Sequence, residues 1–147
     1  MPVLARHPRA IFDYDILEKI EAGIELTGAE VKAARAGHVS LKGAYAAIRS
    51  GQAYLLGAHI SPYAPAGTRL GYDPTRTRTF LLKKNELRRL AGKVESGGLT
   101  LIPLSVYTKA GLIKVELGLA RGKKKYEKRA AIKKREVLRE TRAALKS

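Results

Sequence analysis

The sequence predicts a mainly β protein with α-helices: an antiparallel barrel of about six strands with two or three helices, followed by a basic C-terminal tail. Three observations lead to this prediction. Short stretches alternate apolar and polar residues with a period of two, which is typical of strands with one wet face. No strand–helix–strand crossover repeats along the chain, and closure into a barrel leaves no long unpaired edge. The last 27 residues carry 12 Lys and Arg against three Glu, with few large apolar residues.

The first strand is predicted from Tyr14 to Leu26, where the even positions are mostly apolar and the odd positions mostly charged. Thr27 and Glu30 then form a capping-box pattern, in which the Thr side chain accepts from the N3 amide and the Glu reaches back. The helix that they open is expected to end near Gly37. It presents two cations, Lys32 and Arg35. A solvated basic face and an RNA contact both remain open for these two residues.

A hairpin is predicted over Val39 to Ile60, with its turn at Ser50-Gly51. The next stretch, Ser61 to Arg78, is punctuated by Pro and Gly and predicts a long loop. This loop interleaves basic and aromatic residues, namely Tyr63, Arg69, Tyr72, Arg76 and Arg78. Single-stranded or looped RNA favours such a mixture, because rings stack on bases while guanidinium groups hold phosphates. A loop that is merely mobile is the alternative.

A strand is predicted over Thr79 to Leu82, and Asn85 is the predicted N-cap of a second helix that stops at Gly97-Gly98. The apolar stripe of this helix is expected to face the core and consists of Leu87, Leu90, Ala91 and Val94. Its far side is expected to be solvated. A second hairpin follows, with strands over Leu99 to Tyr107 and Leu112 to Leu119.

The formal net charge of +16 favours an anionic partner, and the part before the tail is itself basic, with 17 Lys and Arg against 10 Asp and Glu. Nucleic acid is favoured over an acidic membrane surface, which would require bulky apolar anchors, whereas the chain has no Trp and two Phe. The absence of Cys removes disulfides and thiolate chemistry and fits a reducing compartment. The N-terminus has no long apolar run, so we expect a soluble, cytoplasmic protein without a membrane contact.

Catalytic and metal-ligand patterns are weak. The three histidines lie far apart in the sequence, at His7, His38 and His59. The stretch Gly118 to Lys124 resembles a phosphate-binding loop, but it is one residue short and has Lys where the magnesium-binding Ser or Thr belongs. The sequence therefore predicts no catalytic residue, no metal site, no cofactor and a protein that is not an enzyme.

Four motifs stand in one order along the chain. They are Glu21-Ala22-Gly23, then Gly28 to Lys32 with Arg35-Ala36-Gly37, then Asp73 to Arg78 with Leu81-Leu82, and finally Gly118 to Lys124 leading to Glu127-Lys128-Arg129. Together they resemble the SsrA-binding protein family, also called small protein B, the bacterial partners of transfer-messenger RNA. The resemblance covers Arg9 to about Leu145. Any single motif is weak, whereas four in register are specific.

The resemblance implies an OB-fold-like barrel that binds the tRNA-like domain of transfer-messenger RNA and rescues ribosomes stalled on messages without a stop codon. The implied RNA-binding residues are Glu21, Lys32, Arg35, Arg76, Arg78 and Leu81. The tail is implied to enter the decoding site and the empty mRNA channel, through Gly122, Lys123, Lys124, Tyr126, Glu127, Lys128 and Arg129. The implied partners are transfer-messenger RNA, the ribosome with small-subunit rRNA at its decoding site and, through the RNA, the tRNA-delivering elongation factor and alanyl-tRNA synthetase.

The residues themselves support these assignments unequally. Arg76 and Arg78 project from one face of an extended segment and could span neighbouring phosphates. Leu81 looks like a core residue. Glu21 could accept from a base amino group or a 2′-hydroxyl, or it could orient a nearby Arg. The N-terminus departs from the family pattern, because His7-Pro8 stands where an Asn and a basic cluster are usual.

The chain is expected to divide into an RNA-binding barrel over residues 1–120 and a tail over residues 121–147. The positive charges of the tail repel one another, so the free tail is expected to be disordered. Its Ala131, Leu138 and Leu145 recur every seven residues and permit a helix on the ribosome. The alternative function is a general basic RNA-binding or ribosome-associated module without a rescue role. A nucleic-acid-processing enzyme is a third, less favoured interpretation.

Overall fold

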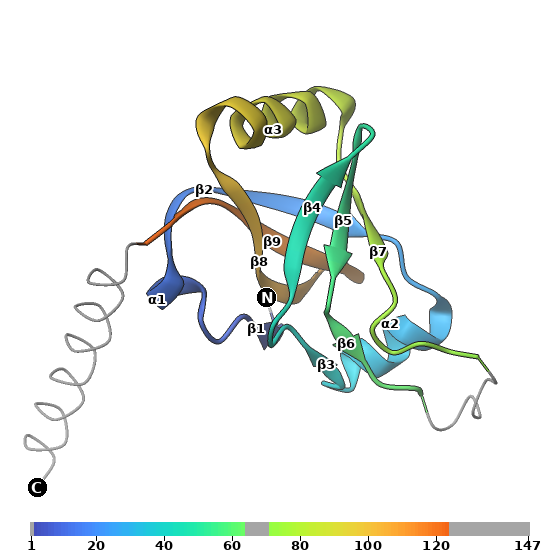
Figure 1. Cartoon of the computed structure of the whole chain (residues 1–147). Coiled ribbons are helices and arrows are strands. Elements are labelled where there is room, and N and C mark those ends of the chain that lie inside the picture. Colours follow the sequence, from blue (N-terminus) through green and yellow to red (C-terminus); the bar gives the residue numbers. More distant parts are fainter. Residues whose placement is uncertain (1, 64–70, 124–147) are drawn as a thin grey trace, which may run out of the picture.

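The structure is a computed structural model and describes residues 2–63 and 71–123 (Figure 1). The helices in these ranges are α1 (Ala10–Asp13), α2 (Gly28–Arg35) and α3 (Lys84–Gly97). The strands are β1 (Val3–Arg6), β2 (Tyr14–Ile24), β3 (Val39–Ser40), β4 (Tyr45–Arg49), β5 (Gln52–Leu56), β6 (His59–Ile60), β7 (Arg78–Leu81), β8 (Thr100–Lys109) and β9 (Leu112–Gly122). The predicted class, mainly β with helices, is confirmed.

The long strands form one antiparallel sheet in the order β1-β8-β9-β2-β7-β5-β4, while β3 pairs with β6. The sheet curls until β4 and β5 cross in front of β2 and β9, and β4 contacts β8 (Figure 1). This curling encloses the core as a barrel. Helix α3 covers one end, and α2 lies at the opposite end beside β6 (Figure 1). Both predicted hairpins are present, as β4–β5 and β8–β9.

The core is built by alternate residues of the long strands, as their period predicts. On β9, Val115 and Leu117 are buried in the same apolar cluster as Phe80 of β7. Helix α3 closes the end of the barrel with Leu87 and Leu90, which are both buried in that cluster. The predicted apolar stripe of this helix is therefore its core face.

Strand β2 contains a bulge that sequence periodicity does not reveal. The register shifts between Ile16 and Glu18, which leaves Leu17 without a partner on β9 and 52% exposed. Such an extra residue changes the side to which the following side chains point. Accordingly Ile20 and Ala22 face the barrel core, whereas Ile16 packs in a small second cluster around α1.

Three local features differ from the sequence-based expectation. The strand β1 and the short helix α1 are not predicted, and α1 buries Ala10 against Ile102 and Ala120 on the outside of the sheet. The prediction of Asn85 as the N-cap of α3 is wrong, because the N-cap is Lys83. Asn85 is the second residue of the helix, and its side chain accepts from the backbone amide of Glu86.

Candidate nucleic-acid interface

The first turn of α2 holds a buried carboxylate. Thr27 and Glu30 form the predicted capping box: each backbone N–H donates to the other side chain, at 2.9 and 3.2 Å. The Glu30 side chain is 1% exposed and pairs with the guanidinium groups of Arg76 and Arg78. Burial opposes ionisation of Glu30, but hydrogen bonds from Arg76, Thr27 and Arg78 outweigh it and lower its pKa to about 2.

The Arg78 guanidinium is enclosed by acceptors, and the whole side chain is buried. Its Nε donates to Glu30 at 2.8 Å, and its other nitrogens donate to three backbone carbonyls, those of Ala58, Pro74 and Arg76. Arg76 and Arg78 thus point to one side, but toward the Glu30 carboxylate. A direct contact between Arg78 and a phosphate would require this cluster to open.

The cluster also fixes the end of the long loop against α2. The Tyr72 hydroxyl donates to the Ile60 carbonyl at 2.8 Å, and Asp73 accepts from the Thr75 amide at 2.9 Å. Arg76 keeps 35% of its side chain exposed while it binds Glu30. Residues 71–77 are therefore held by hydrogen bonds within the loop and to Ile60 and Glu30. The predicted loop cation Arg69 lies outside the described residues.

Two exposed cations stand on the last turns of α2. The Lys32 ammonium lies 5.8 Å from the centre of the Tyr63 ring, where a cation is attracted by the face of the ring. Arg35 donates to the carbonyl of Gly111 in the β8–β9 turn. This contact joins α2 to the second hairpin, so that two segments distant in sequence share one surface. Both side chains remain available to an anion.

An apolar hollow of about 190 Å³ adjoins this hairpin, between β2, β7 and the β8–β9 turn. Leu81 and Leu112 line it and are 56% and 59% exposed. Gly23 lies opposite Leu81, and a Cβ on this glycine would approach the Leu81 Cβ to 3.2 Å. The interpretation of Leu81 as core is therefore wrong, because Phe80 takes the inward position on β7. Lys114 lines the same hollow; the alternation of β9 places it on the outer face, yet sequence reasoning did not select it.

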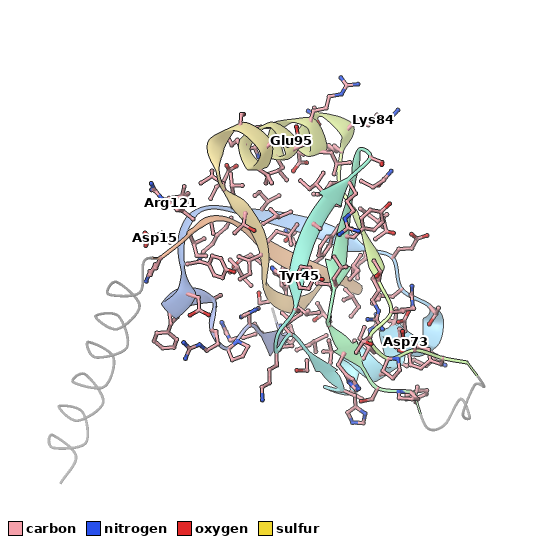
Figure 2. The ribbon with its side chains drawn as sticks, viewed as in Figure 1. Asp15, Tyr45, Asp73, Lys84, Glu95 and Arg121 are labelled. Carbon is pink, nitrogen blue, oxygen red and sulfur yellow. The ribbon has the colours of Figure 1, made fainter. Side chains whose placement is uncertain are left out.

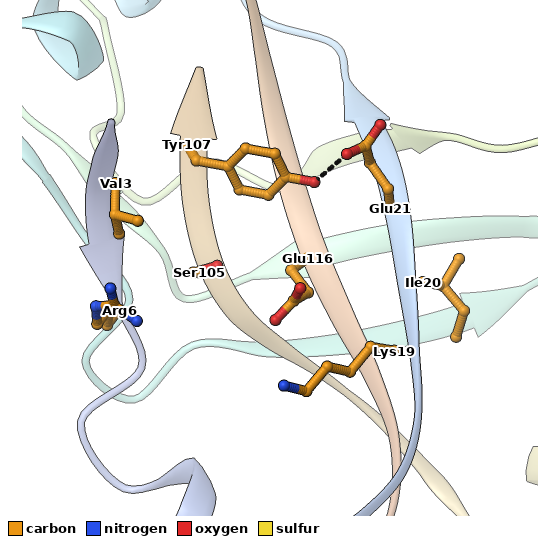
Figure 3. Close-up of a pocket in the computed structure, with 8 residues that line it drawn as sticks. All are labelled: Val3, Arg6, Lys19, Ile20, Glu21, Ser105, Tyr107 and Glu116. Carbon is orange, nitrogen blue, oxygen red and sulfur yellow. Dashed lines mark hydrogen bonds between the residues drawn. The ribbon is translucent and has the colours of Figure 1, made fainter. Parts of the chain in front are cut away.

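Glu21 lies on the outer face of β2, where Tyr107 of β8 donates its hydroxyl to the carboxylate (Figure 3). Lys109 lies 3.3 Å from both carboxylate oxygens. The hydrogen bond from Tyr107 lowers the pKa of Glu21, while burial and Glu21 raise the pKa of Tyr107. Glu21 is therefore a fixed, ionised acceptor at the rim of an outer hollow of about 390 Å³. Lys109 binds it as a cation, where the sequence suggested an Arg.

Only two residues of the implied decoding-site set lie within the described ranges. Gly122 is the last residue of β9 and pairs with Tyr14. Lys123 donates its backbone N–H to the Asp13 carbonyl at 2.8 Å and its ammonium to the Ile11 carbonyl at 2.9 Å. The contacts of β9 and Lys123 thus extend beyond residue 120, as far as the end of α1. The other members of the set, Lys124, Tyr126, Glu127, Lys128 and Arg129, lie outside the described residues.

Residues 2–63 and 71–123 contain no group of three His, Cys, Asp or Glu side chains placed to hold a metal ion. No helix among these residues is long and apolar enough to span a membrane.

A small antiparallel barrel that carries exposed cations beside an apolar hollow belongs to the class of basic β-barrel proteins suited to a polyanion with stacked, partly apolar bases. The model of the SmpB protein family matches residues 4–147. The chain therefore belongs to this family.

Related proteins agree over nearly the full length. The SsrA-binding protein of Nostoc punctiforme is 50% identical over 99% of this chain and 94% of its own length. The SsrA-binding protein of Sulfurihydrogenibium sp. is 50% identical over 98% of this chain and 94% of its own length. A chain in a solved structure described as "tmRNA-SmpB: a journey to the center of the bacterial ribosome" is 48% identical, with a TM-score of 0.68, over 90% of this chain and 95% of that chain.

Proposed function

We propose that this protein binds the tRNA-like domain of transfer-messenger RNA and delivers it to stalled ribosomes for trans-translation. It acts in the cytoplasm as a binding protein and is not an enzyme. Family membership, together with relatives named SsrA-binding protein and a similar chain in a tmRNA–SmpB structure, supports this function. The observation that carries it is the exposed hollow around Leu81, with Lys114 in its lining and Arg35 bonded to the adjoining turn.

The proposed RNA surface divides the work among its residues. Lys32, Arg35 and Lys114 bind phosphates, and Leu81 packs against a sugar or a base. Glu21, held by Tyr107, accepts from a base amino group or a 2′-hydroxyl. Two further members of the RNA-binding set, Arg76 and Arg78, act mainly by holding α2 and the loop through Glu30.

The tail is proposed as a second functional unit that enters the decoding site and the mRNA channel. Its boundary is best tested after Lys123, because β9 pairs through Gly122 and Lys123 bonds to α1. A chain ending at Lys123 is expected to bind transfer-messenger RNA within about twofold of the full chain. It is expected to support no peptide tagging on a message without a stop codon.

Binding assays and a reconstituted tagging reaction measure these two quantities. Loss of both together would contradict a separate role for the tail and would favour a general basic anchor. Normal tagging by the shortened chain would show that rescue does not need the tail, whereas no tagging by the full chain would favour the alternative function, a general basic RNA-binding or ribosome-associated module without a rescue role. An Arg35→Ala variant of the full chain is the matched control, since it should weaken RNA binding while leaving the tail intact.

A further inference from the structure

The outer face of the β4–β5 hairpin carries aromatic side chains that the proposed function does not use. Ala46 on β4 and Ala53 and Leu55 on β5 point into the core. Because side chains alternate along a strand, every second residue of the two strands points outward. The outward set is Tyr45, Ala47 and Arg49 on β4, with Gln52, Tyr54 and Leu56 opposite them on β5. The Tyr45 side chain is 53% exposed and stands on the strand that crosses in front of the barrel (Figure 2).

A hollow of about 200 Å³ lies on this face, and its lining is Arg49, Tyr54, Leu56 and Thr77. These four side chains combine a ring, a guanidinium group, an apolar wall and a hydroxyl. An unpaired base can stack on the ring while the guanidinium group holds a neighbouring phosphate. Tyr45 lies directly across from Leu56, so a second ring stands at the edge of the hollow.

The charge of this segment fits the same ligand. No Asp or Glu occurs between Val31 and Tyr72, while Lys42 precedes strand β4 and Arg49 is its last residue. A phosphate backbone that approaches the hairpin therefore meets no carboxylate on it. Stacking surfaces without opposing negative charge are typical of sites for single-stranded nucleic acid.

This face and the surface around Leu81 point in different directions. The inner side chains of β4 and β5 and those of β2 and β9 meet in one core cluster, so their outer sides face away from each other across the barrel (Figure 1). An RNA domain seated on the outer sides of β2 and β9 leaves the outer side of β4 and β5 uncovered. A second RNA is then the appropriate ligand.

We propose that the outer face of the β4–β5 hairpin binds unpaired nucleotides of ribosomal RNA, with Tyr45 and Tyr54 stacking on bases and Arg49 binding the phosphate between them. The inference rests on the proposed function, because it assumes that transfer-messenger RNA occupies the other side. It assigns a binding role to three residues outside both the RNA-binding set and the decoding-site set.

The test uses the full chain saturated with transfer-messenger RNA and ribosomes stalled on a message without a stop codon. The Tyr45→Ala, Tyr54→Ala double variant is expected to bind these ribosomes about tenfold or more weakly, since two stacked rings are lost. The Tyr45→Phe, Tyr54→Phe double variant keeps both rings and is expected to bind within about twofold of the parent. Leu17→Ala, which removes an equally exposed side chain from β2, is the matched control and should bind normally.

Three further measurements decide the ligand. Affinity for transfer-messenger RNA should be unchanged in both double variants, thermal unfolding should show that all variants are folded, and chemical probing should find rRNA nucleotides that the parent protects and the Ala variant does not. Unchanged ribosome affinity in the Ala variant would overturn the proposal. Weakened affinity for transfer-messenger RNA, or identical protection of rRNA nucleotides by the parent and the Ala variant, would overturn it too. Failure of the proposed function would instead be seen in the parent protein, as no binding of transfer-messenger RNA.

Discussion

Glu30 is a buried carboxylate whose ionisation is coupled to folding. Its pKa is about 2 in the folded protein against an ordinary value of 4.5, so the unfolded chain takes up its proton more readily. A depressed pKa contributes stability that is present above pH 4.5 and is lost as the pH falls toward 2. For Glu30, a pKa shift of this size corresponds to a contribution on the order of 3 kcal/mol to the free energy of unfolding. Urea unfolding at pH 7 and at pH 3 should show most of this loss.

The Glu30→Gln variant is the control for this pH dependence. It is expected to be less stable than the parent at pH 7, because two guanidinium groups lose their anionic partner, and to lose less further stability between pH 7 and pH 3. An equal loss in both proteins would show that other groups govern acid unfolding.

Arg78→Met should lower the free energy of unfolding by about 3–5 kcal/mol at pH 7, since removing one partner of a buried pair leaves the other charge poorly compensated.

Phe80 and Leu81 are neighbours on β7 that face opposite ways, which separates stability from binding. Phe80 is buried and Leu81 is 56% exposed. Phe80→Ala is therefore expected to lower the free energy of unfolding by about 3–5 kcal/mol. Leu81→Ser should change it by no more than about 0.5 kcal/mol, yet it should weaken affinity for transfer-messenger RNA severalfold. Urea unfolding measures the stability of both variants, and filter binding measures their affinity for transfer-messenger RNA. Normal RNA affinity in Leu81→Ser would show that this residue is not part of the interface.

At the scale of elements, α2 is a short helix whose first turn depends on its cap. Thr27→Ala removes the acceptor for the Glu30 amide and is expected to cost about 1 kcal/mol. Thr27→Ser keeps the hydroxyl and should cost much less. Thermal unfolding compares the two variants, and equal losses would mean that the threonine methyl group, rather than the cap, contributes the stability.

Elements with a clear period could be predicted from the sequence, and those set by longer-range contacts could not. The alternation of β9 and the stripe of α3 directly reflect which side chains are buried, as Leu117 and Leu90 illustrate. The bulge at Leu17 is one extra residue and leaves no mark in a short alternating pattern. Helix α1 spans four residues and is held by packing against β8 and β9, so its own sequence carries little information.

At the scale of the whole molecule, topology assembles a surface from distant parts of the chain. Arg35 comes from α2, Leu81 from β7 and Lys114 from β9, and the order of the strands brings them together. Because Leu81 and Leu82 are adjacent, the sequence does not show which of them faces solvent, and only the resemblance to a family selected Leu81. Arg78 illustrates the opposite case, because a basic residue that the sequence assigned to an RNA-binding loop is the first residue of β7 and binds a buried carboxylate.

The distribution of charge between barrel and tail leads to a prediction about salt. The segment from residue 121 onward carries 12 of the 29 Lys and Arg, and the proposed function directs it to the ribosome. If about six of its cations meet phosphates there, the logarithm of the ribosome association constant should fall against the logarithm of salt with a slope about 4 to 5 units steeper than without them. A chain ending at Lys123 should lose most of this extra slope.

The affinity of this shortened chain for transfer-messenger RNA should keep nearly the same salt dependence as that of the full chain, because the cations on α2 and β9 remain. Titrations of both chains with both ligands across a range of salt measure the four slopes, and a shortened chain with an unchanged ribosome slope would show that the barrel, and not the tail, makes the phosphate contacts.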